Sequence, residues 1–318
     1  MNNLSNNQSA GSVVVAALYK FVSLPDYQDL RSDIFTLCND NFIKGTILLA
    51  EEGINGTIAG SRAGIDNLKE FLTSDGRFTG LEYKESFAAT IPFHRLKVKL
   101  KKEIVSMGRE GIEPARLSGT RVDAAQWNEL LNDPEVLVID TRNQYEYDVG
   151  TFLNAVSPEL NSFREFPDYV QNKLDPARHR KIAMFCTGGI RCEKASAFML
   201  QQGFTEVYQL QGGILKYLQE IKPEQNLWQG ECFVFDGRVA VDSELHEGDH
   251  EQCYSCRHPL SSKDRLSGKY EQGISCPHCF DSLTPERRAS LQERQRQVEL
   301  AAARNQLHVG AAMQKSEG

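Results

Sequence analysis

The alternation of hydrophobic and polar positions predicts a series of strands and helices in the first hundred residues. Apolar residues at helical spacing follow Pro25, and a second such segment follows the capping residue Ser61. The glycine-containing residues 51–56 have the composition of a turn. Strand-like alternation or short apolar runs occupy residues 12–22, 43–50, 57–59, 81–87 and 96–100. The predicted order of the first six elements is strand, helix, strand, strand, helix, strand.

A different pattern follows in the middle of the chain. The runs Val136–Ile139 and Ile182–Phe185 are uninterruptedly apolar, which is typical of parallel strands buried on both faces. Helical patterns alternate with them, so we predict a parallel sheet covered by helices on both sides. The fold class is therefore α/β. The predicted parts are a disordered lead over 1–11, a ferredoxin-like (acylphosphatase-like) α+β domain over 12–112, a parallel-sheet domain over 113–225, and a Cys-rich tail with a terminal helix over 226–318.

Composition places the chain among soluble globular proteins. Of 318 residues, 40% are hydrophobic and 25% are charged, and no apolar run approaches the roughly 20 residues of a membrane span. Residues 1–11 lack the basic start and apolar centre of a signal peptide. We therefore expect a cytoplasmic protein without membrane contact. The formal net charge of −7 argues weakly against a general nucleic-acid binder.

The charge is unevenly distributed, however. Residues 84–121 carry an excess of five positive charges, and the strand over 96–100 alternates basic with apolar residues. One interpretation is an edge strand protected by lysines. The other is a track for a phosphate backbone. The pattern leaves both open, and the candidate phosphate-binding residues are Arg95, Lys97, Lys99 and Lys101.

Residues 182–200 combine the features of a reactive thiol. Cys186 stands where a buried strand should end, and a short loop with two glycines leads into a helical pattern. Such a loop turns N–H groups inward, the helix start adds positive potential, and Arg191 adds a cation. These features favour a thiolate at Cys186 over an inert cysteine beside a turn. The loop residues are Thr187, Gly188, Gly189, Ile190 and Arg191.

Two further groups are candidates for supporting this thiol. Asp140, Arg142 and Glu146 follow another strand end, and we favour a structural ion-pair network over direct chemistry. Cys192 follows the loop directly. It is a candidate second, resolving thiol, and the alternative is a small residue facing the core.

The tail contains two Cys-x-x-Cys pairs separated by 19 residues. This spacing is typical of a structural zinc ribbon, in which four thiolates surround Zn²⁺. The alternatives are a metal-free or oxidised site, or replacement of one ligand by His258 or His278. The candidate ligands are Cys253, Cys256, Cys276 and Cys279.

Several motifs together resemble a known family. Asp140-x-Arg142, Glu146-Tyr147, the Cys186 loop and Gly212-Gly213 resemble a rhodanese domain over roughly 120–222. With Glu52-Gly-Ile-Asn-Gly-Thr57 before it and Gly230-Glu-Cys-Phe-Val-Phe-Asp236 after it, the chain resembles the bacterial rhodanese-domain tRNA uridine hydroxylases over nearly its full length.

This resemblance implies oxygen-dependent 5-hydroxylation of the wobble uridine, position 34 of tRNA. The partner is then tRNA, the co-substrate is molecular oxygen, and the matching catalytic residue is Cys186, as a thiolate or persulfide. The sequence contains no motif for an organic cofactor, and it leaves the oligomeric state open. The alternative function is rhodanese-type sulfur transfer through a Cys186 persulfide. A non-catalytic tRNA- or protein-binding module is disfavoured by the intact loop.

Overall fold

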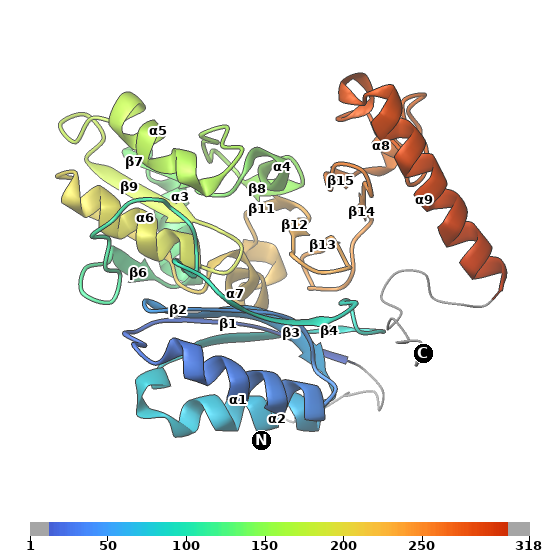
Figure 1. The fold of residues 1–318 in the computed structure, drawn as a ribbon. Coiled ribbons are helices and arrows are strands. Elements are labelled where there is room, and N and C mark those ends of the chain that lie inside the picture. Colours follow the sequence, from blue (N-terminus) through green and yellow to red (C-terminus); the bar gives the residue numbers. More distant parts are fainter. Residues whose placement is uncertain (1–12, 305–318) are drawn as a thin grey trace. The chain divides into compact units, whose positions relative to one another are not determined.

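The computed structural model describes residues 13–304 (Figure 1). The predicted disordered lead over 1–11 and the residues after 304 lie outside this range. The described chain divides into two compact units. The first runs to Gly237 and includes residues 241–247, and the second contains residues 238–240 and the chain from residue 248 onward.

The N-terminal domain is a five-stranded sheet with two helices on one face (Figure 1). The strands lie in the order β4-β1-β3-β2-β5, in which β5 runs parallel to β2 and the other neighbours are antiparallel. This confirms the predicted ferredoxin-like domain. Its elements are β1 (Val13–Phe21), α1 (Tyr27–Asp40), β2 (Lys44–Ala50), β3 (Gly53–Gly60), α2 (Arg62–Ser74), the 3-10 turn η1 (Gly76–Phe78), β4 (Glu82–Ala88) and β5 (Leu96–Leu100).

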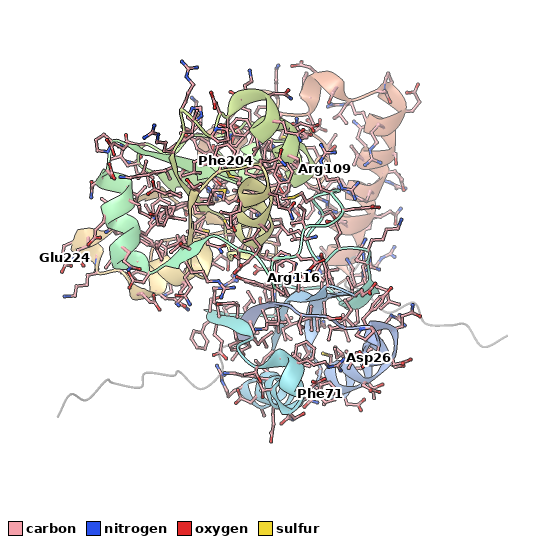
Figure 2. All side chains as sticks on the ribbon, turned by 90° about the vertical axis from the view of Figure 1, so that its left-hand side faces the viewer. Asp26, Phe71, Arg109, Arg116, Phe204 and Glu224 are labelled. Carbon is pink, nitrogen blue, oxygen red and sulfur yellow. The ribbon has the colours of Figure 1, made fainter. Side chains whose placement is uncertain are left out.

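The sequence pattern explains the packing of this domain. Ser61 begins α2 because its side chain accepts a hydrogen bond from Gly64 N at 3.2 Å. The apolar faces of the helices, including Phe71 (labelled in Figure 2), pack on the inward side chains of the strands. The turn predicted over 51–56 is shorter than expected. The strand β3 already begins at Gly53, where φ is +141° and Lys20 of β1 passes too close for a side chain.

The second domain is a parallel four-stranded sheet in the order β6-β10-β9-β7. Successive residues of β9 point to opposite faces of the sheet, and both faces are buried. Ile182 and Met184 pack in one apolar cluster, and Ala183 and Phe185 pack in another. The first cluster contains α5, α6 and Phe204 (Figure 2), and the second contains α3 and α7. This confirms the predicted sheet covered on both sides.

The elements of this second domain alternate as predicted. They are β6 (Thr120–Val122), α3 (Ala124–Asn132), β7 (Val136–Asp140), α4 (Gln144–Tyr147), β8 (Gly150–Phe152), η2 (Phe163–Glu165), α5 (Phe166–Lys173), β9 (Lys181–Phe185), α6 (Ile190–Gln201), β10 (Glu206–Leu210), α7 (Gly213–Glu220), η3 (Pro223–Gln225), β11 (Trp228–Gly230) and β12 (Cys232–Phe233). The strands β8 and β11 form a short antiparallel pair, which joins the segment after α7 to the segment after α4.

The Cys-rich tail contains little regular structure before its final helix. A hairpin is formed by β14 and β15, and the described chain ends in the long helix α9. Thr284 caps α9 through a hydrogen bond from Arg287 N, and Pro285 occupies the first helical turn. No helix within residues 13–304 has the length and apolarity needed to cross a membrane. The elements are β13 (Ala240–Val241), β14 (Glu251–Gln252), β15 (Pro259–Leu260), α8 (Ser262–Arg265), η4 (Phe280–Ser282) and α9 (Pro285–Ala303).

Candidate active site

Cys186 lies at the carboxyl end of the central strand β9, in front of helix α6. Gly189 caps α6 with a φ of +96°, a conformation that favours glycine. Its N–H donates a hydrogen bond to Cys186 Sγ at 3.1 Å. The whole Cys186 side chain is buried, with an exposed fraction of 0%. The sulfur thus accepts hydrogen bonds from the backbone at the end of the predicted loop, from Gly189 and from the N–H groups of Arg191 and Cys192.

The surroundings of Cys186 favour the thiolate. Burial by itself raises the pKa of Cys186. The hydrogen bond from the Cys192 thiol, the charge of Arg191 and the N–H groups of these two residues outweigh burial and lower the pKa to about 6. A thiol with a pKa near 6 is about nine-tenths ionised at pH 7. Cys186 is thus a nucleophile at neutral pH.

Arg191 is held by a buried carboxylate beneath the loop. Its guanidinium forms a two-pronged ion pair with Glu146, with Nη1–Oε1 and Nη2–Oε2 distances of 2.7 and 2.6 Å. Glu146 is fully buried and also accepts a hydrogen bond from the N–H of Asn143 at the start of α4. The cation predicted beside the thiol is therefore fixed in place by a residue of another element. Glu146 therefore supports Arg191.

Asp140 and Arg142 form a second buried ion pair at the end of β7. Arg142 Nε and Nη2 lie 2.9 and 2.6 Å from the Asp140 carboxylate, and Nη2 also donates to Gly150 O at 2.6 Å. Between them, Thr141 N donates to Phe185 O at 3.0 Å, next to Cys186. The structure thus places this pair as a support for the strand end, in line with the interpretation that the sequence favoured.

Cys192 is buried on the first turn of α6, against Cys186. The Thr141 hydroxyl lies 3.6 Å from Cys192 Sγ. Burial raises the pKa of Cys192 well above its ordinary value, and its hydrogen bond to Cys186 adds to this effect. Cys192 is therefore a neutral thiol that donates to the Cys186 thiolate. It also belongs to the apolar cluster of α5 and α6, as the core-facing alternative requires, and its role as a resolving thiol stays a prediction.

The start of α7 closes the loop from another side. Ile214 N and Leu215 N donate to the carbonyl oxygens of Cys186 and Thr187 at 3.0 and 3.1 Å. Gly213 has a φ of +67°, and a Cβ atom there would lie 2.3 Å from Cys186 O. This close approach explains why a glycine is needed at position 213, shortly after the end of the strand β10.

Two residues of the N-terminal domain reach the loop, and the sequence did not identify them as site residues. Lys84 on β4 is 7% exposed and donates to Gly188 O at 2.9 Å. Burial lowers the pKa of Lys84. Tyr19 on β1 donates to Glu193 at 3.4 Å, and its oxygen lies 3.0 Å from where a Gly189 Cβ would be. In the sequence they are only a lysine and a tyrosine within two predicted strands, each about a hundred residues or more before Cys186.

Residues after β11 complete the surroundings of the loop. The Thr187 hydroxyl lies within 3.5 Å of Phe233 O, on the strand β12. Cys232 is fully buried, and burial raises its pKa to about 12 although Arg142 opposes this. Cys232 is therefore a neutral thiol at physiological pH, unlike Cys186.

The basic strand β5 is an edge strand of the N-terminal sheet, as the lysine-protection interpretation requires. Arg95, Lys99 and Lys101 are exposed, and Lys97 is half-buried. The like charges of Arg95 and Lys99, together with partial burial, lower the pKa of Lys97. The position of β5 at the sheet edge fits the lysine-protection interpretation, and the contact with a phosphate backbone stays a prediction.

The four tail cysteines gather at one point. Their sulfur atoms all lie within 4.8 Å of one another, and Cys276 Sγ lies 3.7 Å from both Cys256 and Cys279. Tetrahedral Zn²⁺ with Zn–S bonds near 2.3 Å separates its sulfur ligands by about 3.8 Å. The donor set and its spacing fit this ion. Within residues 13–304, this group contains neither His258 nor His278.

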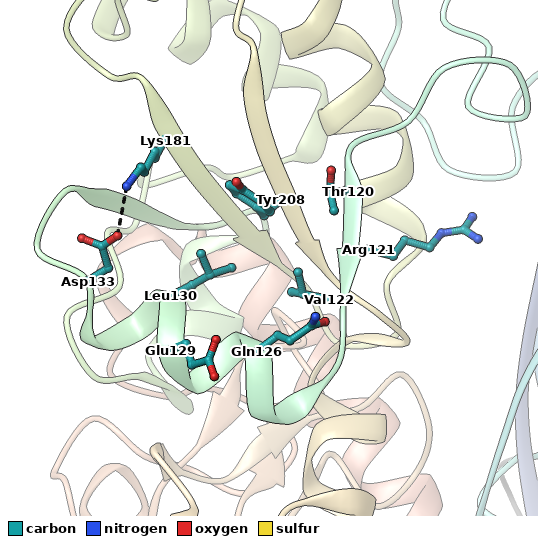
Figure 3. A pocket seen from close by; sticks show the side chains of 9 residues that line it. All are labelled: Thr120, Arg121, Val122, Gln126, Glu129, Leu130, Asp133, Lys181 and Tyr208. Carbon is teal, nitrogen blue, oxygen red and sulfur yellow. Dashed lines mark hydrogen bonds and ion pairs between the residues drawn. The ribbon is translucent and has the colours of Figure 1, made fainter.

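A separate pocket of about 400 Å³ lies beside β6 and α3 (Figure 3). It includes Lys181, the first residue of β9, which pairs with Asp133 at 3.3 Å. Cys186 follows the opposite end of that strand, so this pocket is not part of the thiol site. The other lining residues are Thr120, Arg121, Val122, Gln126, Glu129, Leu130 and Tyr208.

Comparison with known proteins agrees with this geometry. Residues 123–220, which include Cys186 and its loop, match the family described as rhodanese-like domain. Residues 13–104 match the UPF0176 acylphosphatase-like domain. The protein therefore joins a UPF0176 acylphosphatase-like domain to a rhodanese-like domain.

Solved structures resemble the rhodanese-like part. A rhodanese-like domain from Anabaena sp. is 20% identical, with a TM-score of 0.29, and the match covers 35% of this chain and 78% of that one. A rhodanese-related protein from Thermoplasma volcanium is 22% identical, with a TM-score of 0.26, and the match covers 33% of this chain and 95% of that one. A Bacillus halodurans protein is 24% identical, with a TM-score of 0.28, and the match covers 36% of this chain and 80% of that one. Each match covers about a third of this chain.

The ionisation of Cys186 predicts its reactivity as a function of pH. Modification by a small thiol reagent should rise between pH 5 and 7 and level off above, with a midpoint near pH 6, because only the thiolate reacts. Cys38, whose pKa burial raises to about 12, is the internal control and should stay unmodified over this range. Peptide mass spectrometry after brief labelling measures both. A midpoint near pH 9 for Cys186 would contradict the activated thiolate.

Proposed function

We propose that the protein is an enzyme that hydroxylates C5 of the wobble uridine of tRNA, with Cys186 as the catalytic thiolate. The observation that carries the proposal is the Cys186 loop in contact with the UPF0176 acylphosphatase-like domain through Lys84. This pairing of domains is the architecture of the tRNA uridine hydroxylases that the sequence resembles. A thiolate with a pKa near 6 supplies the nucleophile that such a reaction needs.

The proposed chemistry begins with addition of the thiolate to the base. Cys186 Sγ forms a bond to C6 of the uridine, and the electron pair of the C5=C6 bond moves to C5 and the O4 carbonyl. C5 then bonds to one oxygen atom of O₂, and the peroxide anion takes a proton from water, giving a hydroperoxide at C5. A thiol-class reductant delivers two electrons and two protons, and cleavage of the O–O bond leaves a hydroxyl group on C5 and releases water. Loss of the C5 proton and departure of Cys186 restore the double bond.

The loop geometry supports the first and last steps. The N–H of Gly189 and the thiol of Cys192 stabilise the anionic sulfur before attack and again when it departs. Gly188 is half-exposed, and an added Cβ there would meet no atom within 4 Å. Since Cys186 itself is buried, the base approaches from the side of Gly188. Because Lys84 holds the Gly188 carbonyl, it positions this side of the loop.

Isotope labelling tests the reaction directly. The enzyme is incubated with an unmodified tRNA transcript that has uridine at position 34, a thiol reductant and ¹⁸O₂. Nucleoside mass spectrometry should show 5-hydroxyuridine with one heavy oxygen. A product labelled only from H₂¹⁸O, or no oxygenated uridine under any reductant, would count against the proposal.

Sulfur transfer is the second candidate, and the rhodanese-like match favours it. In that reaction, Cys186 takes a sulfur atom from a donor such as thiosulfate to form a persulfide, releases sulfite, and passes the sulfur to an acceptor thiol. The same labelling experiment distinguishes the two functions. A thiolated nucleoside, or rapid thiocyanate formation from thiosulfate and cyanide without any oxygenated uridine, would support sulfur transfer.

We also propose that the tail binds structural zinc through Cys253, Cys256, Cys276 and Cys279. The ion would hold the hairpin β14–β15 and the chain near η4 together and would take no part in the reaction. The support for this is the sulfur spacing described above.

The cations of β5 are proposed to contact the tRNA backbone. Replacing Lys97 and Lys99 by alanine should weaken tRNA binding, and the slope of log affinity against log salt should become shallower by about 1.4 to 1.8, since each phosphate contact contributes about 0.7–0.9. Filter binding over a range of salt concentrations measures both effects. Lys173 and Lys222, exposed lysines of the rhodanese-like domain, form the control pair. An equal loss in both double variants would mean that only net charge matters.

A further inference from the structure

An exposed aromatic side chain projects from the segment that follows β12. Phe235 is 57% exposed, although it belongs to a row of aromatic rings. Its ring meets Phe233 edge-on, with centroids 5.1 Å apart and planes at 87°. Phe233 in turn meets Tyr145 edge-on at 5.2 Å. Single exposed apolar residues are common, but the orientation of this ring is fixed by its edge-on contact with Phe233.

This aromatic row is joined to the Cys186 loop at two points. The Thr187 hydroxyl lies 3.5 Å from Phe233 O. The Arg191 guanidinium carbon lies 5.7 Å from the centre of the Phe235 ring. Arg191 is fixed by its ion pair with Glu146, so it presents a cation of constant position to one side of the ring. Phe235 therefore stands at the rim of the loop that holds the nucleophile.

The same segment contacts the loop that precedes the basic strand β5. Gly237, two residues after Phe235, donates a backbone hydrogen bond to Pro92 O at 2.8 Å. Arg95, the first of the β5 cations, follows Pro92 by three residues and is exposed. The aromatic ring thus contacts the arginine of the Cys186 loop, and its segment contacts Pro92, from which the chain leads into the basic strand. Grooves that bind single-stranded nucleic acid combine such cations with rings on which bases stack.

We propose that Phe235 is a stacking site for a nucleobase of the single-stranded RNA loop that carries the target uridine. This inference rests on the proposed function for the identity of the RNA. In this arrangement the β5 cations hold the phosphates, Phe235 holds one base by its exposed face, and the uridine reaches the loop beside it. Phe235 is a positioning residue, because it acts on the RNA and takes no part in bond making.

Binding without turnover tests this site. The affinity of the full-length protein for an unmodified tRNA transcript with uridine 34 is measured by fluorescence anisotropy without oxygen. Phe235→Ala should bind about 5- to 100-fold more weakly, the range of one lost base–aromatic stack. Phe235→Trp should restore binding, because it preserves a stacking face. Phe35→Ala is the matched control, since Phe35 is 43% exposed on α1, and it should bind like the unaltered protein.

Two further readouts separate stacking from a structural role. The pKa of Cys186, measured by pH-dependent labelling, should be the same in Phe235→Ala as in the unaltered protein. In turnover assays KM should rise while kcat changes less than about twofold. Binding of Phe235→Ala equal to that of the unaltered protein would overturn the proposal. So would failure of Phe235→Trp to restore binding, or absence of tRNA binding by the unaltered protein.

The outcome for Phe235 is distinguishable from that for the reaction. If tRNA binding depends on Phe235 but no oxygenated uridine forms, the stacking site stands and the proposed hydroxylation falls. If hydroxylation occurs and Phe235→Ala binds normally, the reaction stands and the stacking site falls.

Discussion

Cys186→Ser is expected to lower formation of 5-hydroxyuridine by at least ~1000-fold, because a serine hydroxyl does not ionise near neutral pH. The substitution is nearly isosteric, and the N–H of Gly189 can donate to a hydroxyl oxygen as it does to the sulfur. Thermal stability should therefore change little. Quantitative nucleoside mass spectrometry on tRNA treated with each variant measures the effect. Activity within tenfold of the unaltered protein would exclude Cys186 as the nucleophile.

Cys192→Ala supplies the matched comparison, because it removes the thiol that donates to Cys186 and leaves the nucleophile intact. Without this donor the pKa of Cys186 should rise, so activity should be lost near neutral pH and largely recovered at alkaline pH. Cys186→Ser should recover at no pH. If Cys192→Ala is inactive at every pH as well, Cys192 forms a covalent bond in the cycle and is a resolving thiol.

The sequence was most informative where chemistry and local structure coincide in one short segment. Cys186, the two glycines and Arg191 lie within six residues, so the strand, the loop and the helix start could all be predicted from them. The same holds for the fold. Both sheets were predictable because hydrophobic periodicity alone separates alternating strands from fully buried ones. The hairpin of β2 and β3 was placed less accurately, since Gly53 is a strand residue in a conformation that composition reads as a turn.

The remaining site residues were not predictable because long-range packing places them. Lys84 lies 104 residues before Gly188, and nothing in the alternation of β4 shows that its side chain reaches a loop of the next domain. Phe235 lies in the motif Gly230-Glu-Cys-Phe-Val-Phe-Asp236, which was recognisable only as part of the family resemblance. Its proposed role depends on contacts with Arg191 and Phe233. Glu146 was predicted as a member of a structural ion-pair network, but its partner Arg191, 45 residues away, was not.

Removal of zinc is expected to have the largest effect on stability. The apolar cluster of the tail contains only Leu260 as a buried residue besides three of the cysteines, with Tyr270 and Leu283 packed against it. Such a core cannot stabilise the tail by itself. Structural zinc contributes on the order of 10 kcal/mol to small domains of this kind. Cys276→Ser should therefore eliminate one zinc ion per chain and make residues 248–304 sensitive to protease, while the rhodanese-like domain keeps its resistance.

Metal analysis and limited proteolysis test this expectation together. Cys38→Ala is the control, because Cys38 is a buried cysteine of the N-terminal domain outside the sulfur cluster, and this variant should retain one zinc ion per chain. A strong chelator should reproduce the protease sensitivity in the unaltered protein, and added Zn²⁺ should reverse it. Purified protein without zinc but with a protease-resistant tail would show that the four thiols are held by packing alone.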